Sequence, residues 1–73
     1  MGKSTKEKYL QSIASRIKEL RLQRNITQEQ FYFDTSIHIA RIESGKSDIR
    51  VYTLNSSCKY FKISTTEFFE GLI

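Results

Sequence analysis

The sequence predicts an all-α domain built from five short helices. The chain has 73 residues, which is the length of one domain with a small hydrophobic core. It contains no proline, and no stretch alternates apolar and polar residues as a half-buried strand does. Apolar residues instead recur at steps of three or four. The pattern Thr/Ser-x-x-Gln/Glu, which caps helix starts, precedes two of these stretches.

The first helix is expected to run from Lys6 or Lys8 to Arg24, with Asn25 as its C-terminal stop. Its apolar stripe advances in helical steps and consists of Leu10, Ile13, Ile17 and Leu20. Residues 1–7 are polar and basic, and we predict that they form a flexible N-terminal arm. Residues 8–73 then form the single domain.

Two further helices are predicted in the centre of the chain. Thr27 and Gln30 match a capping box and open a second helix over residues 28–33. Residues 34–36, Asp-Thr-Ser, form a polar break, because such side chains cap helix starts. A third helix is expected from Thr35 or Ser36 to Glu43 or Ser44, and Gly45 ends it.

The third helix is amphipathic on a helical wheel. Thr35, Ile39 and Ile42 are expected to face the core, whereas Ile37, Arg41 and Ser44 lie on the opposite side. An Arg next to an Ile suits a DNA major groove, because Arg can bind guanine N7 and O6 and Ile can contact the thymine methyl group. The alternative is that Ile37 packs beneath the second helix.

The last two helices follow a polar loop over residues 46–50. The fourth helix has an apolar stripe of Val51, Leu54, Cys58 and Phe61, and Ser64 with Glu67 forms a second capping box that opens the fifth. Four aromatic residues gather near this end: Tyr60, Phe61, Phe68 and Phe69. Two of the four are expected in the core. The others, with Leu72 and Ile73, are expected to form an apolar patch too large for a lone monomer.

Composition excludes several classes of function. The net charge of +4 fits either ordinary solubility or attraction to a polyanion. A single Cys excludes a disulfide within the chain, the single His argues against a zinc site, and Cys58 is interpreted as a small buried residue rather than a redox sensor. We expect no metal, no cofactor, no small-molecule ligand, no membrane span and no enzymatic activity, in a cytoplasmic protein.

Four stretches, in order and with suitable spacing, resemble the Cro/repressor (XRE, lambda-repressor-like) helix-turn-helix DNA-binding family. They are Ile13-x-x-Arg16-Ile17-Lys18-Glu19-Leu20-Arg21, Thr27-Gln28-Glu29-Gln30, Arg41-Ile42-Glu43-Ser44-Gly45-Lys46 and Ile63-Ser64-x-x-Glu67-Phe68-Phe69. The resemblance covers residues 10–71. It implies a compact five-helix fold with the helix-turn-helix at helices 2 and 3. It also implies a homodimer that binds double-stranded DNA at a two-fold symmetric operator.

The resemblance also implies roles for particular residues. Ser36, Ile37 and Arg41 match base-reading positions, and Gln28 matches a phosphate-contacting glutamine. Arg21 and Glu43 match a partly buried ion pair that ties the first helix to the end of the third. Further phosphate candidates are Thr35, His38, Ser44, Lys46 and Arg50, for each of which a solvated side chain is the alternative. The dimer interface candidates are Phe68, Phe69, Leu72 and Ile73.

The segment between the second and third helices departs from the family pattern. It is short and lacks the usual turn glycine, and Tyr32 stands where a small residue is common. Either the turn is rebuilt around the rings of residues 31–33, or the second helix ends early. Ser57 also replaces a usual apolar residue. The leading hypothesis is a sequence-specific transcriptional regulator of repressor type. The alternative is a protein-interaction module, antitoxin-like, that keeps the fold without base readout.

Overall fold

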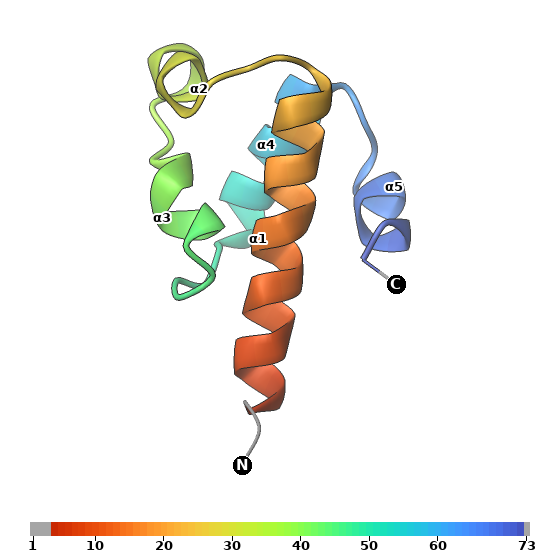
Figure 1. Ribbon diagram of the computed structural model, residues 1–73. Coiled ribbons are helices and arrows are strands. Elements are labelled where there is room, and N and C mark those ends of the chain that lie inside the picture. The colour runs from red at the N-terminus through yellow and green to blue at the C-terminus, as the bar shows by residue number, and fades with distance from the viewer. Residues whose placement is uncertain (1–3, 73) are drawn as a thin grey trace.

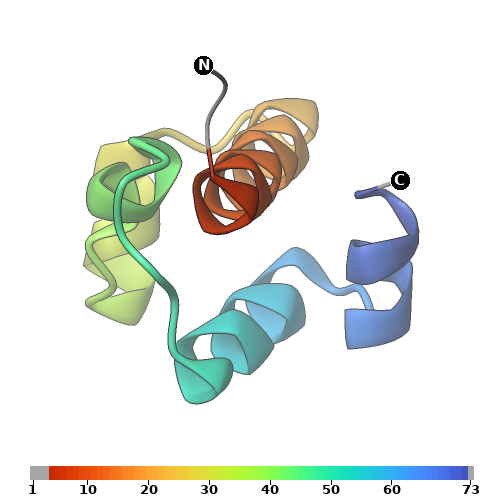
Figure 2. The same cartoon turned by 90° about the horizontal axis from the view of Figure 1, so that it is seen from below.

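Five helices and no strand make up the part of the chain that the computed structural model describes, residues 4–72. The helices are α1 (Thr5–Gln23), α2 (Gln28–Thr35), α3 (Ile39–Glu43), α4 (Val51–Phe61) and α5 (Thr65–Glu70). The long α1 lies between the α2–α3 pair on one side and α5 on the other, and α4 lies across from it (Figures 1 and 2). The all-α prediction is confirmed.

The start of α1 corrects the predicted arm. The Ser4 hydroxyl accepts the Glu7 N–H at 3.1 Å, and the Glu7 carboxylate accepts the Ser4 N–H at 3.2 Å, which is a complete capping box. Residues 4–7 therefore form the cap and first turn of α1 and not a flexible arm. Residues 1–3 of the predicted arm lie outside the described residues.

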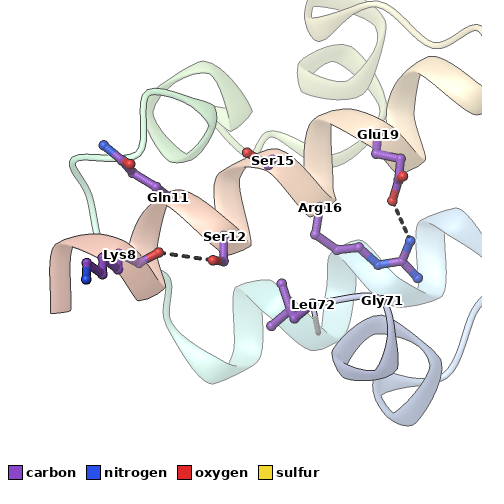
Figure 3. Close-up of a pocket in the computed structure, with 8 residues that line it drawn as sticks. All are labelled: Lys8, Gln11, Ser12, Ser15, Arg16, Glu19, Gly71 and Leu72. Atoms are coloured by element: carbon purple, nitrogen blue, oxygen red, sulfur yellow. Dashed lines mark hydrogen bonds and ion pairs between the residues drawn. The ribbon is translucent and has the colours of Figure 1, made fainter. Parts of the chain in front are cut away.

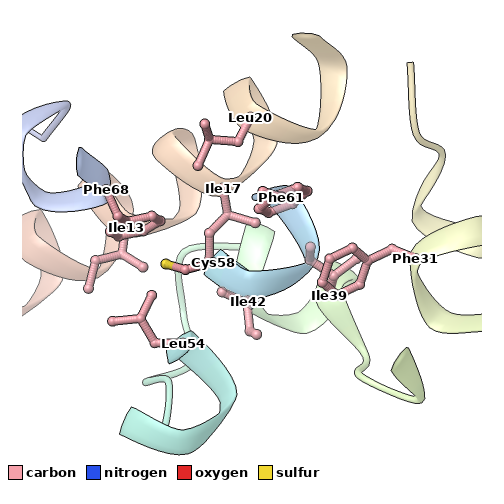
Figure 4. Close-up of a cluster of buried hydrophobic side chains, with 10 residues drawn as sticks. All are labelled: Ile13, Ile17, Leu20, Phe31, Ile39, Ile42, Leu54, Cys58, Phe61 and Phe68. Atoms are coloured by element: carbon pink, nitrogen blue, oxygen red, sulfur yellow. The ribbon is translucent and has the colours of Figure 1, made fainter. Parts of the chain in front are cut away.

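The core is formed by apolar side chains from all five helices (Figure 4). Its members are Ile13, Ile17, Leu20, Phe31, Ile39, Ile42, Leu54, Cys58, Phe61 and Phe68. Phe31 of α2 packs edge-on against Tyr60 and tilted against Phe61, with ring centroids 4.9 and 5.4 Å apart. These ring contacts hold α2 onto α4.

Two of the four C-terminal aromatic residues are buried in the core, as expected, but one residue of the apolar stripe of α4 is not buried. Phe61 and Phe68 are fully buried, whereas Tyr60 is half-buried and Phe69 is 38% exposed. The prediction that Val51 joins the core is wrong, because Val51 is the first residue of α4 and is 84% exposed. Burial of Cys58 fits a packing residue, and it raises the pKa of the thiol.

The buried Ser57 shows how a polar residue is accommodated on α4. Its hydroxyl donates to the Thr53 carbonyl at 2.8 Å, one turn back along the same helix. The hydroxyl group is therefore satisfied without a partner from another element.

The turn between α2 and α3 is rebuilt, and α2 does not end early. Thr35 closes α2: its hydroxyl donates to the Phe31 carbonyl at 2.7 Å and accepts the Ile37 N–H at 3.1 Å. Ser36 then adopts φ 62°, the left-handed conformation for which the family uses glycine. The predicted start of the third helix at Thr35 or Ser36 is wrong, because α3 begins only at Ile39.

The three aromatic residues of α2 point in different directions. Phe31 enters the core, Tyr32 stacks on His38 with ring centroids 4.6 Å apart, and Phe33 is 82% exposed. At the other end of α2, the Thr27 hydroxyl caps the Gln30 N–H as predicted. The prediction that the Gln30 side chain in turn bonds back to Thr27 is wrong, because the Gln30 amide donates to Asp34 instead.

Candidate nucleic-acid interface

An ion pair beneath the surface joins α1 to the end of α3. Arg21 donates from Nε to Glu43 Oε2 at 2.7 Å and from Nη2 to Glu43 Oε1 at 3.0 Å, so the pair is bidentate. The predicted Arg21–Glu43 contact is therefore confirmed. The hydrogen bonds to Glu43 hold the pKa of Arg21 above its ordinary value, against the opposing effect of burial.

Two more hydrogen bonds extend this pair. Arg21 Nη1 donates to the Ile26 carbonyl at 2.8 Å, in the loop before α2, and Gln28 Nε2 donates to Glu43 Oε1 at 3.1 Å. A single carboxylate thus contacts side chains from α1 and from the first turn of α2. The network sets how the two helices of the helix-turn-helix sit against α1.

The outer surface from Ser36 to Arg50 is basic. Arg41, Lys46 and Arg50 are exposed there, and Asp48 is the only exposed acid of this segment, since Glu43 is paired with Arg21. A polyanion that approached this side would meet three cations and one anion. Glycine at 45 has φ 76° and ends α3 as expected.

A hollow lies between the α2–α3 turn and the loop that leads into α4. Ser36, Ile37, His38, Arg41 and Arg50 line this hollow. Five of the predicted DNA-contacting residues are therefore brought together. Ile37 does not project freely into solvent as the wheel indicated. It is half-buried and packs against the core, because it belongs to the turn rather than to α3.

Two of the predicted phosphate contacts are poorly placed to donate. The only O–H of Thr35 is directed to Phe31, and that of Ser44 is donated to the Arg41 carbonyl at 2.6 Å. Both hydroxyls therefore stabilise the turns on either side of α3. Gln28 keeps one amide hydrogen beyond the one it gives to Glu43, and Lys46 and Arg50 are exposed.

One contact that the sequence did not indicate joins α2 to α4. The Tyr60 hydroxyl donates to the Asp34 carboxylate, which also accepts from Gln30 Nε2 at 2.9 Å. These hydrogen bonds, the one from Tyr60 first, lower the pKa of Asp34, and the same contact raises the pKa of Tyr60. No spacing pattern relates residues 26 positions apart, so sequence reasoning had no signal for it.

On the other side of α1, a second hollow lies beside the C-terminal end of α5 (Figure 3). There Arg16 donates from Nε to the Phe68 carbonyl at 3.1 Å, from Nη2 to the Glu67 carbonyl at 3.0 Å and from Nη1 to Glu19 at 2.7 Å. Gly71 lies so close that a Cβ there would be 2.2 Å from Arg16 Cζ. Arg16 thus fastens the last turn of α5 to α1, which is a structural role.

An apolar patch is exposed where α4 begins and α5 ends. It consists of Val51, Tyr52 (80% exposed) and Phe69, which line one hollow. The predicted dimer interface changes accordingly: Phe68 is fully buried and cannot contact a second chain, and Leu72 is half-buried against the core. Ile73, the fourth predicted interface residue, lies outside the described residues.

Within residues 4–72, no three or more His, Cys, Asp or Glu side chains are grouped as metal ligands would be. In the same part of the chain, no helix combines the length and the apolar character needed to cross a membrane.

Comparison with known proteins identifies the family of this fold. A family model described as helix-turn-helix matches residues 17–68, from the middle of α1 to α5, which includes the ion pair, the rebuilt turn and the hollow. Searches of curated proteins and of solved structures found no significant match. The match covers more than half of the chain and spans all five helices. The protein therefore belongs to the Cro/repressor (XRE) helix-turn-helix family of DNA-binding regulators.

Proposed function

We propose that the protein is a sequence-specific transcriptional regulator that binds a two-fold symmetric operator as a homodimer. The observation that carries the proposal is the basic surface from Ser36 to Arg50, held in place by the Arg21–Glu43 pair. Arg41 is exposed on α3 and would read a base, because its guanidinium can donate two hydrogen bonds to guanine.

Phosphate contacts would surround the base-reading residues. Gln28 is suited to this role because Glu43 fixes one of its amide hydrogens and leaves the other to donate. It also stands at the N-terminus of α2, where the helix dipole favours an anion. His38, Lys46 and Arg50 are exposed along the same surface.

The second copy would dock through the patch of Val51, Tyr52 and Phe69. Val51 directly follows Arg50, so the apolar patch borders the basic surface. A two-fold axis through this patch would place two basic surfaces side by side, as half-sites about 34 Å apart on one face of a duplex require. Burial of two exposed aromatic rings would stabilise the pair.

The DNA-binding proposal is tested by selecting bound duplexes from a random pool and titrating variants on the selected site. Arg41→Ala should lose preference for that site, whereas Gln28→Ala should weaken binding to selected and unrelated duplexes alike. Lys18→Ala, an exposed cation on α1, is the matched control and should change little. Equal losses of preference for Arg41→Ala and Gln28→Ala would contradict base reading by Arg41.

The dimer proposal is tested by sedimentation with and without the selected duplex. Tyr52→Glu should shift the protein to monomer and weaken binding to the full site more than to a half-site. Phe33→Glu alters an equally exposed ring on α2 and serves as the control. A wild-type chain that stays monomeric in both conditions would contradict the homodimer.

The second candidate is a protein-interaction module, and the exposed Phe33 beside the half-exposed Tyr32 on α2 favours it. The salt dependence of binding separates the two. A regulator must lose affinity for DNA steeply as salt rises, because each phosphate contact releases counterions. Absence of any salt-dependent DNA binding would support the interaction module.

A further inference from the structure

The hollow between the α2–α3 turn and the loop before α4 has three isoleucines in its lining. Ile37, Ile42 and Ile49 are buried or half-buried there, as is Thr53, and the exposed lining residues include Arg41, Asp48 and Arg50. Its volume of about 450 Å³ greatly exceeds that of a water molecule, about 30 Å³, so it can admit the edge of a base. Charged groups therefore stand around an aliphatic centre.

The backbone around this centre is already hydrogen-bonded inside the protein. The Ile37 N–H is donated to Thr35, and the Ile37 carbonyl accepts the Ile39 N–H at 2.9 Å. The Ile49 N–H is donated to the Asp48 carboxylate at 2.8 Å. Ile37 and Ile49 therefore present their alkyl side chains to a ligand without a free N–H. Both are held in position before any ligand arrives.

The arginines that make no side-chain hydrogen bond within the described part of the chain are the two that line this hollow. Three of the five, Arg16, Arg21 and Arg24, donate to carbonyl or carboxylate groups within the domain. Arg41 and Arg50 make no side-chain hydrogen bond or ion pair with the described residues, and both line the hollow. The two arginines whose guanidinium groups remain available thus line the same hollow as the half-buried Ile37 and Ile49.

We propose that this hollow recognises a 5-methylpyrimidine–guanine step in duplex DNA, and the proposal rests on the DNA-binding function above. The C5-methyl group is the apolar feature of the major groove, and it would contact Ile37 and Ile49. Arg41 would donate to N7 and O6 of the adjacent guanine, and Arg50 to a phosphate of the same step. The methyl group belongs to thymine or to 5-methylcytosine. Ile49, in the loop after α3, thereby becomes a specificity-determining residue.

The test uses the full chain and the selected duplex in a fluorescence anisotropy titration. Each thymine followed by guanine is replaced in turn by deoxyuridine, which removes only the methyl group. At the contacted step the dissociation constant should rise about fourfold, which corresponds to one buried methyl group. Replacing that thymine–adenine pair by a cytosine–guanine pair should weaken binding, and 5-methylcytosine in its place should recover about fourfold.

Variants locate the effect. Ile49→Val and Ile37→Val should reduce the thymine-to-uracil difference and Ile49→Ala should abolish it, whereas Leu22→Ala, an exposed apolar residue on α1, should preserve it. The wild-type duplex comparison stands even where a variant fails to fold.

Several results would overturn the proposal while leaving the proposed function intact. These are a selected site without a thymine–guanine step, equal affinity for thymine and uracil at every such step, and a response to thymine without one to 5-methylcytosine. A thymine-to-uracil difference that is undiminished in the folded Ile49→Ala and Ile37→Val variants would show that the methyl group is not read in this hollow. Loss of all salt-dependent DNA binding would instead refute the proposed function itself.

Discussion

Replacing Glu43 by alanine should destabilise the domain far more than its position at the end of a five-residue helix suggests. The change removes the acceptor of three hydrogen bonds, two from Arg21 and one from Gln28. Arg21 would keep only its bond to the Ile26 carbonyl, although its side chain is 9% exposed and that of Glu43 5%. An uncompensated cation would then stay covered by protein.

The magnitude follows from the position of the pair. Breaking a buried ion pair by removing one partner costs about 3–5 kcal/mol. In a domain of this size the pair is close to solvent, so the lower end, about 3 kcal/mol, applies. A loss of 1 kcal/mol in the free energy of unfolding lowers the thermal midpoint of a domain this small by roughly 4–8 °C. Glu43→Ala should therefore lower Tm by about 12 °C or more.

Urea denaturation followed by far-ultraviolet circular dichroism measures this change. Glu19→Ala is the matched control, because Glu19 also pairs with an arginine but its side chain is 53% exposed, and its removal should cost at most about 1 kcal/mol. The double variant Arg21→Met with Glu43→Leu should lie within about 1 kcal/mol of the wild type, because no charge is stranded. A loss below about 1 kcal/mol for Glu43→Ala would refute the reasoning.

Three other outcomes are expected. Ser36→Gly should raise the free energy of unfolding by about 1 kcal/mol in urea titrations, because Ser36 holds φ 62°; a loss of stability would contradict the account of the turn. The Asp34 pKa is lowered, so its bond to Tyr60 stabilises the fold above the ordinary carboxyl pKa of about 3.9 and is lost as pH falls through the folded pKa. The Tyr60 pKa is raised, so its contribution is lost as pH rises past about 10. Tyr60→Phe should therefore flatten the pH profile of Tm at both ends. An unchanged profile would show that the hydrogen bond between Tyr60 and Asp34 does not contribute to stability. Cys58 should react with a thiol reagent only as fast as the protein opens, because the residue is 1% exposed and burial also raises its pKa; rapid reaction in the native state would contradict its burial.

Local patterns predicted what local chemistry controls. The capping box of Ser64 and Glu67 formed as expected because both partners lie within one turn of helix. The same kind of signal is present at Ser4 and Glu7, within residues predicted to form a flexible arm, and it opens α1. Thr35 and Ser36 show the limit of such signals, because hydroxyl side chains cap helix starts and close helix ends alike, and here they close α2.

Burial was harder to predict than helix formation. Periodicity placed Val51 on the same stripe as Leu54 and Cys58, but Val51 opens the helix at the edge of the domain, where nothing covers it. Phe68 and Phe69 are adjacent, so composition could not tell which one enters the core. The Arg21–Glu43 pair, 22 residues apart, followed from the family resemblance rather than from spacing. Ile37 lies in a turn, and a helical wheel does not describe a turn.

The division of the arginines has a consequence for how this protein can evolve. Arg16, Arg21 and Arg24 maintain the architecture through fork-shaped contacts that lysine cannot reproduce, so they constrain mutation. The side chains of Arg41 and Arg50 make no such contact within the described residues, and those of His38 and Lys46 donate no hydrogen bond there. Single substitutions at these positions change the surface offered to a partner at little cost to folding. New binding preferences are therefore accessible one mutation at a time, on a scaffold whose own requirements stay the same.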